Sequence, residues 1–179
     1  MKRFVEKYTF LFLIAGLIVA LDQWTKSLVR NNLPVGATWL PGALEWLSPY
    51  ARIVHWYNTG AAFGMFQNGS VVFATLAVVV IGAILYYFPQ VDKKDWTLRL
   101  AMSMQLAGAI GNLIDRLLHA GKVTDFISVS TFAVFNVADA SISVGTVVLL
   151  LGVYLQERAV QKEKAQLGDE NQTGKVTIE

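Results

Sequence analysis

Residues 8–28 form one apolar run, YTFLFLIAGLIVALDQWTKSL, which is long enough to cross a lipid bilayer as a helix. Three further runs of similar length follow, at about 70–88, 97–118 and 135–156. A membrane-spanning helix needs roughly 20 predominantly apolar residues, and each of these four segments meets that length. The sequence therefore predicts a mainly α-helical membrane protein with four transmembrane helices.

The composition agrees with a membrane protein and excludes several other classes. Of the 179 residues, 54% are apolar and 16% are charged, whereas soluble domains are about one quarter charged. This excludes a disordered chain, a nucleic-acid-binding arm and an ordinary soluble enzyme. The absence of cysteine excludes disulfide bonds, a thiolate nucleophile, Cys-bound zinc and iron–sulfur clusters.

Lysine and arginine predict the orientation, because they are enriched on the cytoplasmic side. Ten of the fifteen fall on the side of the termini and five on the other side, the latter being Lys26, Arg30, Arg52, Arg116 and Lys122. We therefore expect both termini in the cytoplasm and the loops 29–69 and 119–134 outside. Residues 1–156 would form the membrane domain, and the polar segment 157–179 a disordered cytoplasmic tail.

The first outer loop, residues 29–69, has more structure than a simple connector. Residues 51–57 (ARIVHWY) favour a strand, and Asn58-Thr59-Gly60 indicates a turn. We expect a small extracytoplasmic β element on the membrane surface. Its aromatic residues could alternatively serve as an interfacial belt at the helix ends, namely Trp39, Trp46, Trp56, Phe63 and Phe66.

Several polar residues lie within or beside the predicted spans, where each costs free energy unless it is paired. The predicted topology brings all of them to the outer ends of the helices. They are Asp22 and Lys26 in the first span, Asn58 before the second, Asn112, Asp115 and Arg116 in the third, Asp125 in the following loop, and Asn136 and Asp139 in the fourth. The sequence thus predicts a single polar site at the outer membrane interface.

The spacing of these residues also allows purely structural roles. Asp22 and Lys26, four residues apart, can form an ion pair on one helix face, and Arg116 can neutralise the adjacent Asp115. Asparagines within spans often form hydrogen bonds between helices. An acidic residue such as Asp139 is favourable in the first turn of a helix. Asp125 has Lys122 as its one nearby basic residue.

Most hydrolytic chemistries lack their sequence signatures here. There is no HExxH, GxSxG, Walker A or GxGxxG motif. Two adjacent carboxylates can share one proton, so that one activates water and the other protonates the scissile group, with no metal or cofactor. The spacing alone does not decide whether Asp115 or Asp125 would belong to such a pair.

Five motifs occur in one order: LDQWTK (21–26), NTGAAFG (58–64), GAIGNLIDR (108–116), VTDF (123–126) and FNVAD (135–139). This pattern, over residues 15–150, resembles the bacterial lipoprotein signal peptidases, or signal peptidase II family. The resemblance implies an aspartic endopeptidase of the bacterial inner membrane. Such an enzyme removes the signal peptide from diacylglyceryl-modified prolipoproteins and cleaves just before the lipidated Cys.

The resemblance also implies roles for individual residues. Asp125 and Asp139 match the catalytic pair, Asp22 and Lys26 match residues that shape the site, and the residues matching those that line it are Asn58, Gly60, Asn112, Arg116 and Asn136. The implied partners are diacylated prolipoproteins, membrane lipids and globomycin-type inhibitors, with a monomeric enzyme and no nucleic acid. The connection from Asp125 to Asp139 is shorter than in many members of that family.

A second hypothesis is a non-enzymatic membrane protein, such as a small transporter or an assembly factor, that uses its acids as a proton or ion relay. A relay would have polar groups near the middle of the membrane or on both sides of it. The predicted gathering of the acids on the outer side favours the peptidase.

Overall fold

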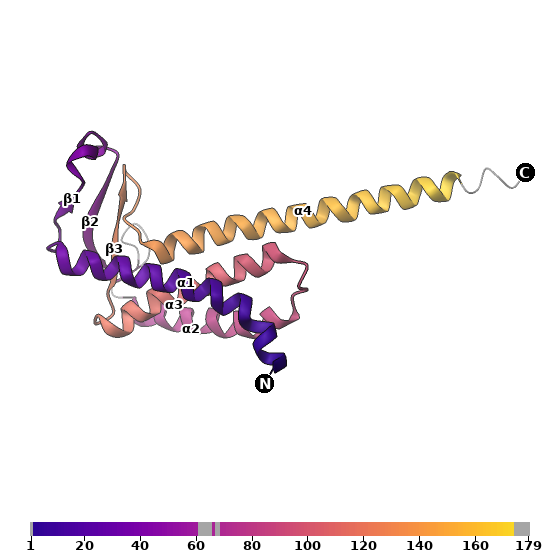
Figure 1. Cartoon of the computed structure of the whole chain (residues 1–179), viewed down its shortest axis with the longest axis horizontal. Helices are drawn as coiled ribbons and strands as arrows, with labels where there is room; N and C mark the ends of the chain where they lie inside the picture. Colours follow the sequence, from indigo (N-terminus) through magenta and orange to yellow (C-terminus); the bar gives the residue numbers. More distant parts are fainter. Residues whose placement is uncertain (1, 61–65, 67–68, 174–179) are drawn as a thin grey trace, which may run out of the picture.

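The computed structural model describes residues 2–60, 66 and 69–173, which form a helical bundle with a small sheet at one end (Figure 1). The helices are α1 (Lys2–Asn32), α2 (Ser70–Tyr87), α3 (Trp96–Leu118) and α4 (Val137–Thr173), with short 3-10 helices η1 (Gly42–Leu47) and η3 (Phe88–Gln90). The strands are β1 (Thr38–Trp39), β2 (Ala51–Asn58) and β3 (Val123–Val129).

Three helices in the described ranges are long and apolar enough to cross a membrane, namely α1, α2 and α4. They show that the chain is a multi-pass membrane protein, as predicted. The remaining predicted span, the third along the chain, is α3. It is less apolar because it is the central helix and contacts the other three. Its polar side chains Ser103, Asn112 and Asp115 are buried against neighbouring protein instead of facing lipid.

The apolar core lies where α1, α2 and α3 meet, around Leu11, Phe88 and Leu106, each fully buried. Arg99 closes this core at the end opposite the sheet. It is 7% exposed, its guanidinium lies 4.2 Å from the ring centre of Phe88, and it donates hydrogen bonds to the carbonyl oxygens of Lys7 and Val91. This stacking allows a buried cation without a carboxylate partner in the described structure.

Small residues let α3 approach α4 and α1 closely, as the GAIGN segment indicates. A Cβ atom on Gly108 would lie 2.6 Å from the carbonyl oxygen of Ala138 and would also meet Ile142. One on Gly111 would lie 2.7 Å from a carboxylate oxygen of Asp22. The first turns of α4 are therefore held against α3 at the level of the polar residues.

The sheet confirms the predicted β element and extends it. Its antiparallel order is β1-β2-β3, and β2 contains the predicted strand 51–57. β3 comes from the second predicted outer loop, 119–134. This strand was not predicted, although its sequence VTDFISV is rich in β-branched residues. An irregularity in the register between Ile53 and Trp56 makes Asn58 pair with Val123, two residues from Asp125.

Two predicted segments differ from the structure or lie outside it. α4 continues to Thr173, so residues 157–173 extend the helix instead of forming the predicted disordered tail. This segment is rich in Ala, Gln, Glu and Lys, which favour helix, and the preceding span provides a nucleus. Residues 61–64 of the NTGAAFG motif, including Phe63, lie outside the described residues, as do residues 174–179.

Candidate active site

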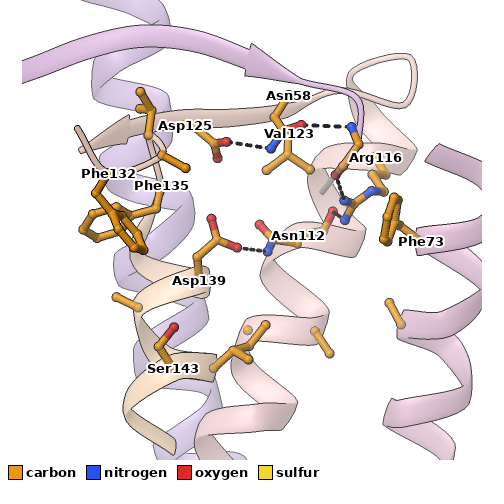
Figure 2. A pocket seen from close by; sticks show the side chains of 18 of the residues that line it. Asn58, Phe73, Asn112, Arg116, Val123, Asp125, Phe132, Phe135, Asp139 and Ser143 are labelled. Carbon is orange, nitrogen blue, oxygen red and sulfur yellow. Dashed lines mark hydrogen bonds between the residues drawn. The ribbon is translucent and has the colours of Figure 1, made fainter. Parts of the chain in front are cut away.

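The predicted polar residues gather at the sheet end of the bundle around one cavity of about 630 Å³ (Figure 2). The cavity is bounded by β2, β3, α2, α3 and the first turns of α4. Six of the residues singled out from the sequence line it, namely Asn58, Gly60, Asn112, Arg116, Asp125 and Asp139. Helix ends and two strands distant in sequence thus contribute to one site.

Asp125 is placed by β3 and is almost completely buried, with 1% of its surface exposed. Its Oδ1 accepts a 2.7 Å hydrogen bond from Nδ2 of Asn136, and its Oδ2 accepts one of 3.1 Å from Nδ2 of Asn58. Asn58 lies diagonally opposite Asp125 on the neighbouring strand, which explains their contact. The backbone N–H of Gly60 donates to Oδ1 of Asn58 and fixes the orientation of that amide.

Asp139 is placed by the first turn of α4 and is half-buried. Nδ2 of Asn112 donates to its Oδ1 at 2.7 Å, and the backbone N–H of Asn136 donates to its Oδ2 at 3.2 Å. In return, the backbone N–H of Asp139 donates to Oδ1 of Asn136 at 3.0 Å. This reciprocal arrangement is a helix cap, and it points the carboxylate toward the cavity, where Figure 2 shows it facing Asp125.

Asn136 joins the two acids. Its side-chain N–H groups reach Asp125 and Asn112, while its oxygen and backbone cap Asp139. Burial, together with the negative charge of Asp139, raises the pKa of Asp125 to about 7, although the hydrogen bonds from Asn136 and Asn58 act in the opposite direction. Asp125 can therefore hold a proton near neutral pH.

Arg116 lies at the cavity wall and does not form the predicted ion pair with Asp115. It donates long hydrogen bonds to the carbonyl oxygens of Asn112 and Gly60, at 3.4 and 3.5 Å, and its guanidinium lies 5.4 Å from the ring centre of Phe73. Its Nε is buried and has no hydrogen-bond partner in the described ranges. The adjacent positions 115 and 116 project from different sides of α3, because successive helical residues are about 100° apart.

Asp115 is instead neutralised from α1. Its carboxylate lies 3.4 Å from Nζ of Lys26 and 3.6 Å from Nη1 of Arg30, and it accepts a 2.8 Å hydrogen bond from the backbone N–H of Thr124. The predicted pair of Lys26 with Asp22 is present at 2.9 Å. These contacts make Asp115 part of a buried ion cluster behind the cavity, and it does not line the cavity.

Sequence reasoning missed two members of this cluster. Arg30 follows Lys26 by four residues, a spacing that places both on one face of α1. Gln23 donates hydrogen bonds to the carboxylates of Asp22 and Asp115 and to the carbonyl oxygen of Gly111. The helical spacing of Asp22, Lys26 and Arg30 was the available signal.

This arrangement suits hydrolysis by a carboxylate pair. One acid is buried and can carry a proton, the other is half-buried and held by donors, and both border a cavity. Within the described ranges, no group of three or more acidic, His or Cys residues could hold a metal ion. The buried acids of the described chain, Asp22, Asp115 and Asp125, all lie at the sheet end, which is not the distribution of a transmembrane relay.

Comparison with known proteins identifies the family. A family model described as signal peptidase (SPase) II matches residues 14–155. The lipoprotein signal peptidase of Enterococcus faecalis is 35% identical over 86% of this chain and 92% of its own length, and that of Listeria monocytogenes is 38% identical over 82% and 94%. A solved structure described as a bacterial membrane enzyme shares the fold, with a TM-score of 0.74 and 28% identity over 82% of this chain and 88% of that one. With a family match over most of its length and the geometry of an acid pair, the chain belongs to the signal peptidase II family.

Proposed function

We propose that Asp125 and Asp139 are the catalytic pair with which this chain, as an aspartic peptidase of the signal peptidase II family, removes the signal peptide from prolipoproteins. The observation that carries the proposal is that two carboxylates from different elements border one cavity and are bridged by Asn136. The substrate is the diacylglyceryl-modified form, and cleavage occurs just before the lipidated Cys.

The geometry suggests different roles for the two acids. Asp139 sits at the N-terminus of α4, where the helix dipole and two N–H donors favour negative charge, so it is the candidate general base. It takes a proton from water, and the resulting hydroxide attacks the peptide carbonyl carbon. Asp125, with its pKa of about 7, donates its proton to the carbonyl oxygen. When the C–N bond breaks, the proton held by Asp139 passes to the leaving amine. One hydroxyl of the tetrahedral intermediate returns its proton to Asp125 as the carboxyl group of the product forms.

The cavity wall provides the features that an extended peptide needs. Arg116 and the backbone around Gly60 offer polar contacts near the acids, while Gly108, Ala109 and Ala140 leave room for a chain to approach closely. We assign Asn58, Gly60, Asn112, Arg116 and Asn136 to binding substrate or shaping the site. Globomycin-type inhibitors would occupy the same cavity.

The same proposal includes the arrangement in the membrane. The chain is a monomer with four spans, which are α1, α2, α4 and the less apolar α3, and both termini are cytoplasmic. The active site then lies at the extracytoplasmic face of the bacterial inner membrane, in contact with membrane lipids. The central position of α3 among three apolar helices of similar direction supports this arrangement (Figure 1).

The direct test is cleavage of a synthetic prolipoprotein peptide with a diacylglyceryl-modified Cys by the purified enzyme in detergent. Asp125→Asn and Asp139→Asn each remove one carboxylate with little change in volume, and we expect each to lower kcat by about 10³-fold or more. The measurement is the mass shift of the product on a gel.

Glu45→Gln is the matched control, because Glu45 is an exposed acid of the predicted outer loop that does not line the cavity. It should cleave at the rate of the wild type. Retained cleavage by either folded Asp variant would refute the assigned pair, and a requirement for Asp115 in its place would move the chemistry to the ion cluster.

A further inference from the structure

Lys26 is buried behind the active site and reaches it through one side chain. It is fully buried and is not among the described residues that line the cavity. Its Nζ lies 2.9 Å from Asp22 and 3.4 Å from Asp115, and it donates a 3.1 Å hydrogen bond to Oδ1 of Asn112. Asn112 in turn donates to Asp139 at 2.7 Å. An ammonium group and a candidate catalytic carboxylate therefore contact opposite ends of one amide.

We propose that Lys26 is a positioning residue of the catalytic pair, because its ammonium group holds Asn112 in the orientation that presents an N–H to Asp139. The inference rests on the proposed function of Asp125 and Asp139 and adds a role for a residue that does not touch substrate. Lys26 would then both neutralise Asp22 and Asp115 and orient the Asn112 amide.

The reason is the asymmetry of the amide. An ammonium group can donate hydrogen bonds but cannot accept them, so the end of Asn112 that faces Lys26 must be its oxygen. The opposite end is then the NH₂ group, and it faces the Asp139 carboxylate. Nδ2 of Asn136 also donates to Oδ1 of Asn112, at 3.2 Å, and supports the same orientation. With the amide reversed, its oxygen would face a carboxylate oxygen, and two acceptors would repel each other.

The charge of Lys26 also acts on the pair. Its charged neighbours are Asp22 on α1 and Asp115 on α3, and its field reaches Asp139 on α4 and Asp125 on β3. Burial and the negative charge of Asp139 raise the pKa of Asp125, whereas the positive charge of Lys26 lowers it. Removing this positive charge should therefore raise that pKa and move the active pH range upward. A residue that only supports the fold would not shift the pH profile.

Lys26→Met tests the proposal, because methionine fills a similar volume without charge or hydrogen-bond donors. We expect kcat for the lipidated peptide to fall by about 10- to 100-fold with KM nearly unchanged, as when a reacting group is misplaced. The pH profile of kcat should move to higher pH. Arg30→Met is the matched control, because Arg30 also lies near Asp115, at 3.6 Å, but it donates its hydrogen bond to Thr124 instead of Asn112. It should keep kcat within about twofold of the wild type and leave the pH profile unchanged.

A double-mutant cycle shows whether Lys26 acts through Asn112. If it does, Lys26→Met combined with Asn112→Ala should have the same kcat as Asn112→Ala alone, when each variant is measured at its own optimal pH. Additive losses would overturn the inference, as would a folded Lys26→Met variant with the kcat and pH profile of the wild type. The Asp139→Asn variant separates the two possible failures. If the Lys26 tests fail and Asp139→Asn is active, the proposed function itself is wrong. If the Lys26 tests fail and Asp139→Asn is inactive, only the role of Lys26 is wrong.

Loss of Lys26 leaves the buried Asp22 without its cation, and that variant could fail to fold. The combination Asp22→Asn with Lys26→Met removes one charge of each sign and keeps the cluster balanced. Compared with Asp22→Asn alone, it should show the same 10- to 100-fold loss of kcat and the same shift of the pH profile. Equal kcat and equal pH profiles for these two variants would refute the role of Lys26.

Discussion

At the scale of single residues, the site is organised by three asparagines that hold two acids. Asn58 and Asn136 donate to Asp125, while Asn112 donates to Asp139. The oxygen of each amide accepts a hydrogen bond from another donor. The donor is the backbone N–H of Gly60 for Asn58, the backbone N–H of Asp139 for Asn136, and the ammonium group of Lys26 for Asn112. The amide orientations are thus set by neighbours, and every one of them presents N–H groups to a carboxylate.

The raised pKa of Asp125 predicts a pH dependence of stability. The folded protein holds this proton up to about pH 7, whereas an unfolded carboxyl loses it near 3.8. The stabilisation by the bound proton is therefore complete below pH 3.8 and is lost as the pH rises to about 7. The asparagine of Asp125→Asn cannot ionise, so this variant does not lose that stabilisation. The difference in Tm, variant minus wild type, should therefore increase by a few degrees between pH 4 and 7 and stay constant above pH 7.

Thermal unfolding in detergent at a series of pH values measures this difference. Glu45→Gln serves as the control, since an exposed acid should give a constant difference across the series. A Tm difference for Asp125→Asn that does not change between pH 4 and 7 would contradict the protonated state assigned to Asp125.

At the scale of elements, the site depends on how closely α3 and α4 pack. Gly108 and Gly111 on α3 face the first turns of α4 and Asp22 on α1, where no side chain fits. Asp139 and Asn112 lie on these same two segments. The distance between the helices therefore controls the 2.7 Å hydrogen bond between Asn112 and Asp139.

Gly108→Ala should both destabilise the protein and reduce cleavage. Its Cβ would lie 2.6 Å from the carbonyl oxygen of Ala138, so α4 must move away from α3. We expect a loss of about 1–3 kcal/mol of stability from overpacking and a lower kcat. Thermal unfolding and the peptide cleavage assay measure the two effects.

Gly82→Ala on α2 is the matched control. A Cβ atom there meets nothing within 4 Å, so the substitution should raise stability by up to about 1 kcal/mol through helix propensity and leave kcat unchanged. Equal behaviour of the two variants would show that the packing of α3 against α4 does not position Asp139.

At the scale of the whole molecule, the polar site lies at one end of the bundle and the long C-terminal helix extends from the other (Figure 1). The cavity is lined by residues up to Val144, whereas α4 continues to Thr173. The sheet covers the site end, so the chemistry and the last turns of α4 are separated by the length of the membrane domain.

This separation predicts that the end of α4 is dispensable for cleavage. A chain truncated after Gln161 retains all of the cavity, the sheet and the core around Leu106. Its kcat and KM for the lipidated peptide should remain within about twofold of the full-length values. A larger loss of kcat in a folded truncated protein would assign the tail a role in catalysis.

The proposed orientation can be tested with single cysteines, because the chain contains none of its own. Glu45→Cys in η1 should react with a membrane-impermeant maleimide on intact spheroplasts. Lys94→Cys, in the exposed turn before α3, should react only after permeabilisation. The reverse pattern would invert the topology, and labelling of both on intact spheroplasts would place the two sites on the same side, with an even number of spans between them.

The sequence by itself predicted the four helices, the β2 strand and most of the polar residues that gather at the cavity. Long apolar runs permit little besides membrane-spanning helices, and polar residues in such runs are costly enough to identify a site. Helical spacing also predicted the pair of Asp22 with Lys26. These features depend on neighbours within about four residues, which a sequence records directly.

Only the tertiary structure decided how these residues are partnered. Asp115 pairs with Lys26 and Arg30 across two helices, instead of with its sequence neighbour Arg116, and β3 forms because β2 provides its hydrogen bonds. Likewise, packing brings Asn112 and Asn136 between the acids. The physical reason is that buried charges and amides are satisfied by the donors that folding brings within hydrogen-bond or ion-pair distance, and these come from segments far apart in the chain.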